Sequence, residues 1–149
     1  VLDDKLALAR QLGATDTFNA TDPDAIATIR EVTKGGVDYA FEMAGSVKAM
    51  DLCYRVTRRG GTTVTAGLPH PDHRFEVQHV SLVAEERTVK GSYICSCVPL
   101  RDVPRYIALY RQGTLPVDRL MSERLGLEQI NEGFDRLADG RTVRQIIVP

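Results

Sequence analysis

The spacing of hydrophobic positions changes repeatedly along this chain, and the changes mark alternating helices and strands. Apolar residues recur every three to four positions in some segments, whereas other segments are short runs rich in β-branched and aromatic residues. The predicted helices are 2–12, 22–34, 46–59, a short turn near 80–83, 99–112 and 127–138, and the predicted strands are 16–20, 37–42, 62–66, 88–94 and 143–148. This alternation predicts an α/β fold with a mostly parallel sheet.

The segment from Gly36 to Leu68 has the pattern of a strand, a helix that Gly60-Gly61 is expected to end, and a second strand. Two strands joined by one helix of this length form a right-handed βαβ unit. Small residues follow both strands, Ala44-Gly45 after the first and Gly67 after the second. Ligands of doubly wound sheets bind at this edge, so the unit resembles the second half of a dinucleotide-binding fold. An α/β sheet with turn glycines and no ligand fits the same pattern.

Composition narrows the class of protein. The 149 residues are enough for one ordinary domain, and a net charge of −1 gives no reason to expect nucleic acid or an anionic membrane as a partner. The three cysteines match no disulfide framework and no CxxC pair, which favours a reducing compartment. The sequence shows no signal peptide and no apolar run long enough to cross a membrane. We therefore expect a cytoplasmic protein.

Several candidate chemical groups carry little weight. His70, His73 and His79 lie in a connection that lacks a second ligand set, so a zinc site there is not favoured. The pair Cys95 and Cys97 is expected to be buried or to line a pocket. Asp38 and Glu42 stand beside the apolar residues of the 37–42 strand, and no catalytic role is assigned to them because their spacing alone does not show a shared cleft. We expect no metal ligands and no catalytic residues in this chain.

Five stretches, in unbroken order, resemble one known family. They are LALARQLGATDTFNA, GGVDYAFEMAGSVKAM, GGTTVTAGLP, RTVKGSYIC and INEGFDRLADGRTVRQIIVP. Together they resemble the C-terminal part of the zinc-type medium-chain alcohol dehydrogenases, and the resemblance extends over essentially the whole chain. The resemblance implies an oxidoreductase that moves a hydride between an alcohol and NAD or NADP.

The resemblance also implies how the fold is organised. Residues 1–94 would form an incomplete Rossmann-type doubly wound parallel sheet that begins with the family's third strand, DTFNA. Residues 95–149 would form the helix–strand segment that returns to the catalytic domain. The family's zinc ligands, glycine-rich loop and ribose-binding acid would precede Val1, so we expect a fragment that is inactive alone.

The resemblance assigns cofactor contacts to three turns, two basic residues and the first residue. Val1 would pack on the adenine, Lys5 would reach the ribose and Arg144 would contact the diphosphate with its planar fork. The first turn faces the adenosine, and the other two form the nicotinamide carboxamide pocket. The turn residues are Met43, Ala44 and Gly45, then Ala66, Gly67 and Leu68, then Ser92, Tyr93 and Ile94.

The remaining expectations concern partners and alternatives. NAD is favoured over NADP, zinc is expected only outside this chain, and the substrate would be a small alcohol or aldehyde. The 88–94 strand would be an edge that pairs with its equivalent in a homodimer. Two alternatives stay open, namely a zinc-free reductase of the quinone or enoyl type and a non-catalytic nucleotide-binding or dimerisation module.

Overall fold

The computed structural model describes residues 2–140 and 142–149, apart from the side chain of Cys95, and the chain divides into two compact units. The first unit extends to Cys97 and the second begins at Val98. The first contains α1 (Asp3–Gln11), α2 (Ala25–Val32), β1 (Val37–Glu42), α3 (Val47–Val56), β2 (Thr57–Thr65), α4 (His79–Ala84), β3 (Thr88–Gly91) and the 3₁₀ turn η1 (Tyr93–Ser96). The second contains α5 (Pro99–Arg111), η2 (Val117–Leu120), β4 (Met121–Leu125), η3 (Leu127–Gln129), α6 (Ile130–Ala138) and β5 (Arg144–Ile147).

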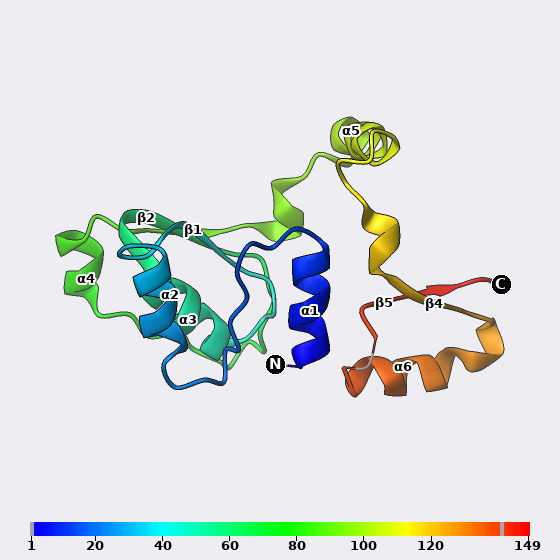
Figure 1. Ribbon diagram of the computed structural model, residues 1–149, viewed down its shortest axis with the longest axis horizontal. Helices are drawn as coiled ribbons and strands as arrows, with labels where there is room; N and C mark the ends of the chain where they lie inside the picture. The colour runs from blue at the N-terminus through cyan, green and yellow to red at the C-terminus, as the bar shows by residue number, and fades with distance from the viewer. Residues whose placement is uncertain (1, 141) are drawn as a thin grey trace. The chain divides into compact units, whose positions relative to one another are not determined.

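The first unit is built on a three-stranded parallel sheet. The strand order is β1-β2-β3, and both pairings are parallel. Helix α3 packs on β1 and β2, and α2 packs on α3, so that Figure 1 shows the two helices side by side. The prediction of an α/β fold with parallel strands is confirmed.

Alternation along β1 determines which face of the sheet the helices cover. Ala40 and Glu42 are buried, whereas Tyr39 and Phe41 on the opposite face are exposed. The helical spacing of α3 brings Met50 and, one turn later, Tyr54 into the same core. The first unit therefore has a small core on one side of the sheet, made of Ala25, Ala40, Met50, Tyr54 and Val56.

The passage from α3 into β2 differs from the prediction that Gly60-Gly61 ends the helix. The helix ends at Val56, and Thr57 already pairs with Val37 of β1. The hydroxyl of Thr57 donates to the Cys53 carbonyl at 2.7 Å and lies 2.8 Å from the hydroxyl of Thr63, and both threonines are fully buried. These hydrogen bonds replace the expected glycine stop, because they satisfy the last turn of the helix while the chain joins the sheet.

Two predicted strands are wrong in whole or in part. The DTFNA segment, Asp16–Ala20, forms no strand. β propensity alone does not provide a ladder partner, and in the described sheet β1 pairs with β2 and not with DTFNA. The predicted 88–94 strand ends at Gly91, where its partner β2 ends at Thr65. Beyond that point η1 turns the chain away, with Ile94 at a φ of +47°.

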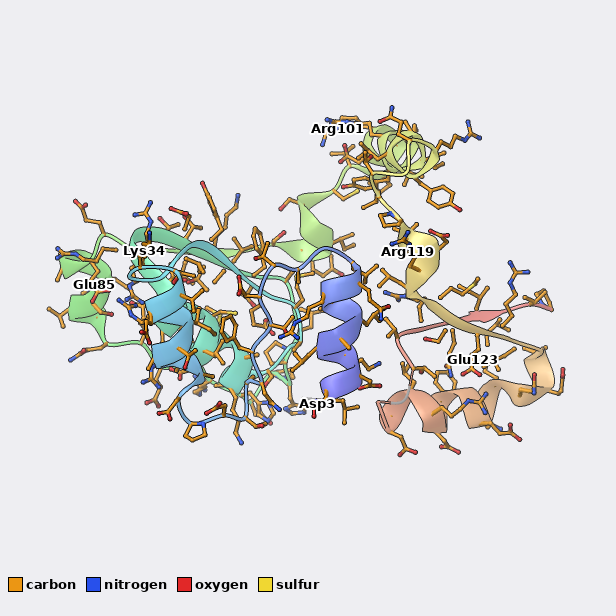
Figure 2. All side chains as sticks on the ribbon, in the orientation of Figure 1. Asp3, Lys34, Glu85, Arg101, Arg119 and Glu123 are labelled. Atoms are coloured by element: carbon orange, nitrogen blue, oxygen red, sulfur yellow. The ribbon has the colours of Figure 1, made fainter. Side chains whose placement is uncertain are left out.

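The second unit contains a parallel pair of strands and the helices α5 and α6. β4 pairs with β5, and Glu123 of β4, labelled in Figure 2, joins both neighbours. Its carboxylate accepts hydrogen bonds from Arg136 Nε of α6 at 3.1 Å and from the Gln145 amide of β5 at 2.7 Å. In the described part of both units, no helix is long and apolar enough to cross a bilayer.

Candidate functional site

The carboxyl ends of β1 and β2 bring two of the predicted turns into direct contact. Parallel strands end at the same edge of a sheet, so the turn after Glu42 lies beside the turn after Thr65. A Cβ placed on Gly67 would lie 2.1 Å from the backbone nitrogen of Gly45, and one placed on Gly45 would lie 3.1 Å from the backbone nitrogen of Leu68. The turns therefore pack backbone against backbone.

The backbone of Gly45 also requires glycine for a second reason. Its φ is +66°, which lies in the left-handed region that other residues rarely adopt. This conformation directs the chain from β1 toward α3, whose first residue is Val47. The small residues noted in the sequence are thus explained by close approach within the edge itself.

Glu42 connects both turns. It is only 2% exposed, and its Oε1 accepts hydrogen bonds from the backbone N–H groups of Ala44 and Gly45 at 2.7 Å each and of Ser46 at 3.3 Å. Its Oε2 accepts a hydrogen bond from the Thr65 hydroxyl at 2.8 Å.

The backbone of Glu42 reaches the second turn as well. Its carbonyl oxygen accepts hydrogen bonds from the N–H groups of Ala66 at 2.9 Å and of Gly67 at 3.4 Å. One residue at the end of β1 therefore holds the 44–46 turn with its side chain and the 66–67 turn with its main chain. Thr65 joins the same network from β2.

The hydrogen bonds to Glu42 also determine its charge. Burial raises the pKa of this carboxyl, but the Thr65 hydroxyl and the N–H groups of Ser46, Gly45 and Ala44 outweigh burial and hold the pKa below its ordinary value. Glu42 is therefore an anion at neutral pH.

The third predicted turn completes the same edge. The N–H of Ser92 donates to the Thr65 carbonyl at 2.9 Å, which ties the end of β3 to the end of β2. Tyr93 and Ile94, which follow, are 74% and 65% exposed. The first two turns add exposed Met43 and Leu68, so the edge combines backbone polar groups with four exposed apolar side chains.

The remaining predicted cofactor residues lie elsewhere. Lys5 is half-buried in the first turn of α1, and Arg144 is exposed at the start of β5 in the second unit. Val1 lies outside the described residues. The contacts expected of these three residues stay predictions.

The histidine connection and the cysteines give no metal centre within the described part of the chain. The rings of His70 and His73 lie 5.6 Å apart, and His70 Nδ1 is 3.5 Å from the Asp72 carboxylate, which is almost fully exposed. Among the residues described, no group of three or more His, Cys, Asp or Glu side chains could hold a metal ion. These residues do not fit a zinc site, and no chemistry is assigned to zinc here.

Glu42 is the residue that sequence reasoning missed. The alternation of β1 places it on the same face as Ala40, which packs into the core, and a carboxylate on a buried face requires several donors. The two small residues after it, Ala44 and Gly45, are the signal of a turn tight enough to present N–H groups back to that carboxylate.

Known proteins resemble this chain in sequence and in fold. The sequence profile of the zinc-binding dehydrogenases matches residues 1–112. An NDMA-dependent alcohol dehydrogenase of Amycolatopsis methanolica is 36% identical over 146 residues, which is 94% of this chain and 38% of that protein.

Two solved structures extend the comparison. An alcohol dehydrogenase zinc-binding domain protein from Burkholderia ambifaria superposes with a TM-score of 0.94 at 33% identity, covering 100% of this chain and 40% of the other. A protein from Sinorhizobium meliloti 1021 with NADP bound superposes with a TM-score of 0.85 at 25% identity, covering 99% and 43%.

These matches share two properties. Each covers nearly all of this chain, and the chain spans about 40% of the length of the relatives. The resemblance to the C-terminal part of the zinc-type alcohol dehydrogenases is thereby confirmed. With a profile match over 1–112 and a Rossmann-like parallel sheet in its first unit, this chain belongs to the zinc-binding dehydrogenase family.

Proposed function

We propose that this chain supplies cofactor-binding walls of an NAD(P)-dependent alcohol dehydrogenase that acts on a small alcohol or aldehyde. The observation that carries the proposal is the contact between the two glycine turns at the carboxyl edge of the sheet. At such an edge a dinucleotide can approach the backbone closely. The planar rings of the cofactor can pack against the exposed apolar side chains around the turns.

The roles of individual residues are those that the family resemblance implies, and the geometry supports them only by bringing the three turns to one edge of the sheet. Met43, Ala44 and Gly45 would face the adenosine, and Ala66, Gly67 and Leu68 would meet the nicotinamide carboxamide. Ser92, Tyr93 and Ile94 would complete that pocket. Lys5 would contact the ribose, Val1 the adenine and Arg144 the diphosphate.

These residues bind and orient rather than react. The nicotinamide ring carries the hydride when the cofactor is bound. The chain would hold that ring by its carboxamide and keep the cofactor extended along the sheet edge. We assign no proton transfer to residues of this chain, and we propose that the chain alone does not turn over an alcohol.

The domain assignment and the cellular location are part of the same proposal. Residues 1–94 would be the partial dinucleotide-binding domain, and residues 95–149 would be the segment that returns to a catalytic domain. The three cysteines, in a pattern that favours a reducing compartment, support a cytoplasmic location.

The experiment that tests the function is a titration of the intact protein, which we define as this chain together with the catalytic domain that the proposal assigns to it. The ligands are NADH and NADPH, and binding is followed by nicotinamide fluorescence. We expect saturable binding, with NADH favoured, and oxidation of a primary alcohol by the same preparation with the oxidised cofactor. The NADP in the Sinorhizobium meliloti structure is the reason to test both cofactors.

Binding without turnover would instead favour a non-catalytic nucleotide-binding module, and reduction of a quinone or enoyl substrate without alcohol oxidation would favour a zinc-free reductase. Absence of binding would reject the proposal.

We also propose that β3 forms the edge of a homodimer. Its four residues, Thr88–Gly91, are all exposed, and Lys90 is their only charge. An exposed outer strand with one charge is open to pairing with a second copy. We expect a dimer of the intact protein at micromolar concentration in sedimentation velocity, and Val89→Pro should shift it toward monomer because proline cannot donate to a ladder. A wild-type monomer under these conditions would contradict the proposal.

A further inference from the structure

We propose that Glu42 is a positioning residue that makes the two cofactor turns one rigid element, and this rests on the proposed function. The turns are separated by 20 residues of chain and share no regular secondary structure. The register of β1 with β2 brings the two turns together, and contacts at the sheet edge hold them in place. Glu42 supplies these contacts with both its side chain and its main chain.

The side chain acts through its two oxygens in different directions. Oε1 accepts three hydrogen bonds from the turn after β1, and Oε2 accepts one from the Thr65 hydroxyl at the end of β2. A carboxylate suits this place because it accepts at both oxygens, and hydrogen bonds to a charged acceptor are stronger than neutral ones. The lowered pKa of Glu42 agrees with a site that stabilises the anion.

The same carboxylate occupies the start of α3. Ser46 precedes the first residue of the helix, and its N–H is one of the three donors to Glu42. The start of a helix attracts anions and is a common phosphate site in dinucleotide-binding folds. Here an internal carboxylate already takes the N–H groups of residues 44–46, so these groups are not free to bind a phosphate. This fits a turn that faces the adenosine.

Glu42 also keeps the turns at contact distance. A Cβ on Gly67 would lie 2.9 Å from Oε2 of Glu42 as well as 2.1 Å from Gly45. The carboxylate, Gly45 and Gly67 are thus in close contact, with no room for a Cβ on Gly67. Removal of the carboxylate takes away the shared acceptor of three part-buried N–H groups, which allows the turn after β1 to move away.

The test compares Glu42→Ala with Glu42→Gln in the intact protein, and Glu31→Ala on the exposed face of α2 is the matched control. We expect Glu42→Ala to raise the KM for the nicotinamide cofactor about 10- to 100-fold while kcat at saturating cofactor stays near wild type. Glu42→Gln retains an acceptor oxygen at the same position, so its KM should lie between those of the wild type and Glu42→Ala. Glu31→Ala should change neither parameter.

Amide hydrogen exchange gives a second measurement that does not depend on the cofactor. Glu42→Ala should speed exchange at Ala44, Gly45 and Ser46 and leave the ladder amides between β2 and β3 protected. If Glu42→Ala does not fold, the test uses Glu42→Gln, which should increase the exchange rate at the same amides by a smaller amount.

The outcomes separate this inference from the proposed function. If the wild type binds neither NADH nor NADPH, the proposed function fails and Glu42 has no cofactor turn to position. Unchanged KM and unchanged exchange in both variants would overturn the role of Glu42 while leaving the proposed function intact. Loss of protection throughout the sheet, with kcat falling and KM unchanged, would show that Glu42 only maintains the fold and would also overturn it.

Discussion

Gly67→Ala is expected to abolish most of the cofactor affinity of this protein. The added Cβ would lie 2.1 Å from the backbone nitrogen and 2.5 Å from the Cα of Gly45. Backbone atoms cannot rotate away as a flexible side chain can, so the two turns must separate. Displacement of a binding group by about 1 Å can cost roughly 100-fold in function. We therefore expect the Kd for NADH to rise about 100-fold, with about 1–3 kcal/mol lost from the free energy of unfolding.

Gly91→Ala is the matched control for this substitution. Gly91 lies at the end of β3, and a Cβ there would meet no atom within 4 Å. This variant should bind NADH and unfold as the wild type does. Equal effects of the two substitutions in NADH titration and in denaturant unfolding would show that the contact between the turns does not control cofactor binding.

Arg144→Ala is expected to weaken cofactor binding without altering the fold. Arg144 is exposed at the start of β5, and its described hydrogen bond runs from the backbone N–H to the Ser122 hydroxyl at 3.3 Å, which alanine keeps. A charge-assisted hydrogen bond to phosphate contributes about 1.5–3 kcal/mol, so the Kd should rise about 10- to 100-fold. The melting temperature should not change.

Two further variants make the Arg144 experiment specific. Arg144→Lys keeps the charge but loses the planar fork, so its Kd should lie between those of the wild type and the alanine variant. Arg124→Ala removes an exposed arginine from the neighbouring strand β4 and should have little effect. A Kd that is the same for the wild type and Arg144→Ala would reject the assignment to the diphosphate.

The parallel strands and the two glycine turns could be predicted because they have strong local signals. Alternation between periods of two and of about 3.6 residues identified β1, α3 and β2, and small residues after Glu42 and Thr65 marked the edge. What the sequence did not contain is the contact between Gly45 and Gly67. That contact depends on how β1 and β2 are aligned in register, which local propensity does not determine.

The errors share one physical cause, which is dependence on a partner elsewhere in the chain. DTFNA has the composition of a strand but no ladder, and the strand at 88–94 is shortened to Gly91 because its partner β2 ends at Thr65. Gly60-Gly61 was expected to stop a helix that the buried pair Thr57 and Thr63 ends earlier. In each case a long-range hydrogen bond, or its absence, overrides the local preference.

Glu42 was missed for a related reason. Its position on the inward face of β1 is evident from alternation with Ala40, but its donors come from the path of the turn that follows. An isolated acid next to a strand is more often solvated than buried. The combination of an inward acid and a following small-residue turn is the pattern that distinguishes this case.

Amide chemical shifts of the ¹⁵N-labelled intact protein, recorded as NADH is added, report which residues of this chain bind the cofactor. We expect the largest saturable shifts at Gly45, Gly67 and Ser92, at the carboxyl ends of the three strands of the sheet. We expect small shifts at Ser81 and Glu85, which line a separate hollow of about 430 Å³ in the first unit. Shifts concentrated at that hollow, or absent from the carboxyl edge at saturating NADH, would contradict the claim that this edge binds the cofactor.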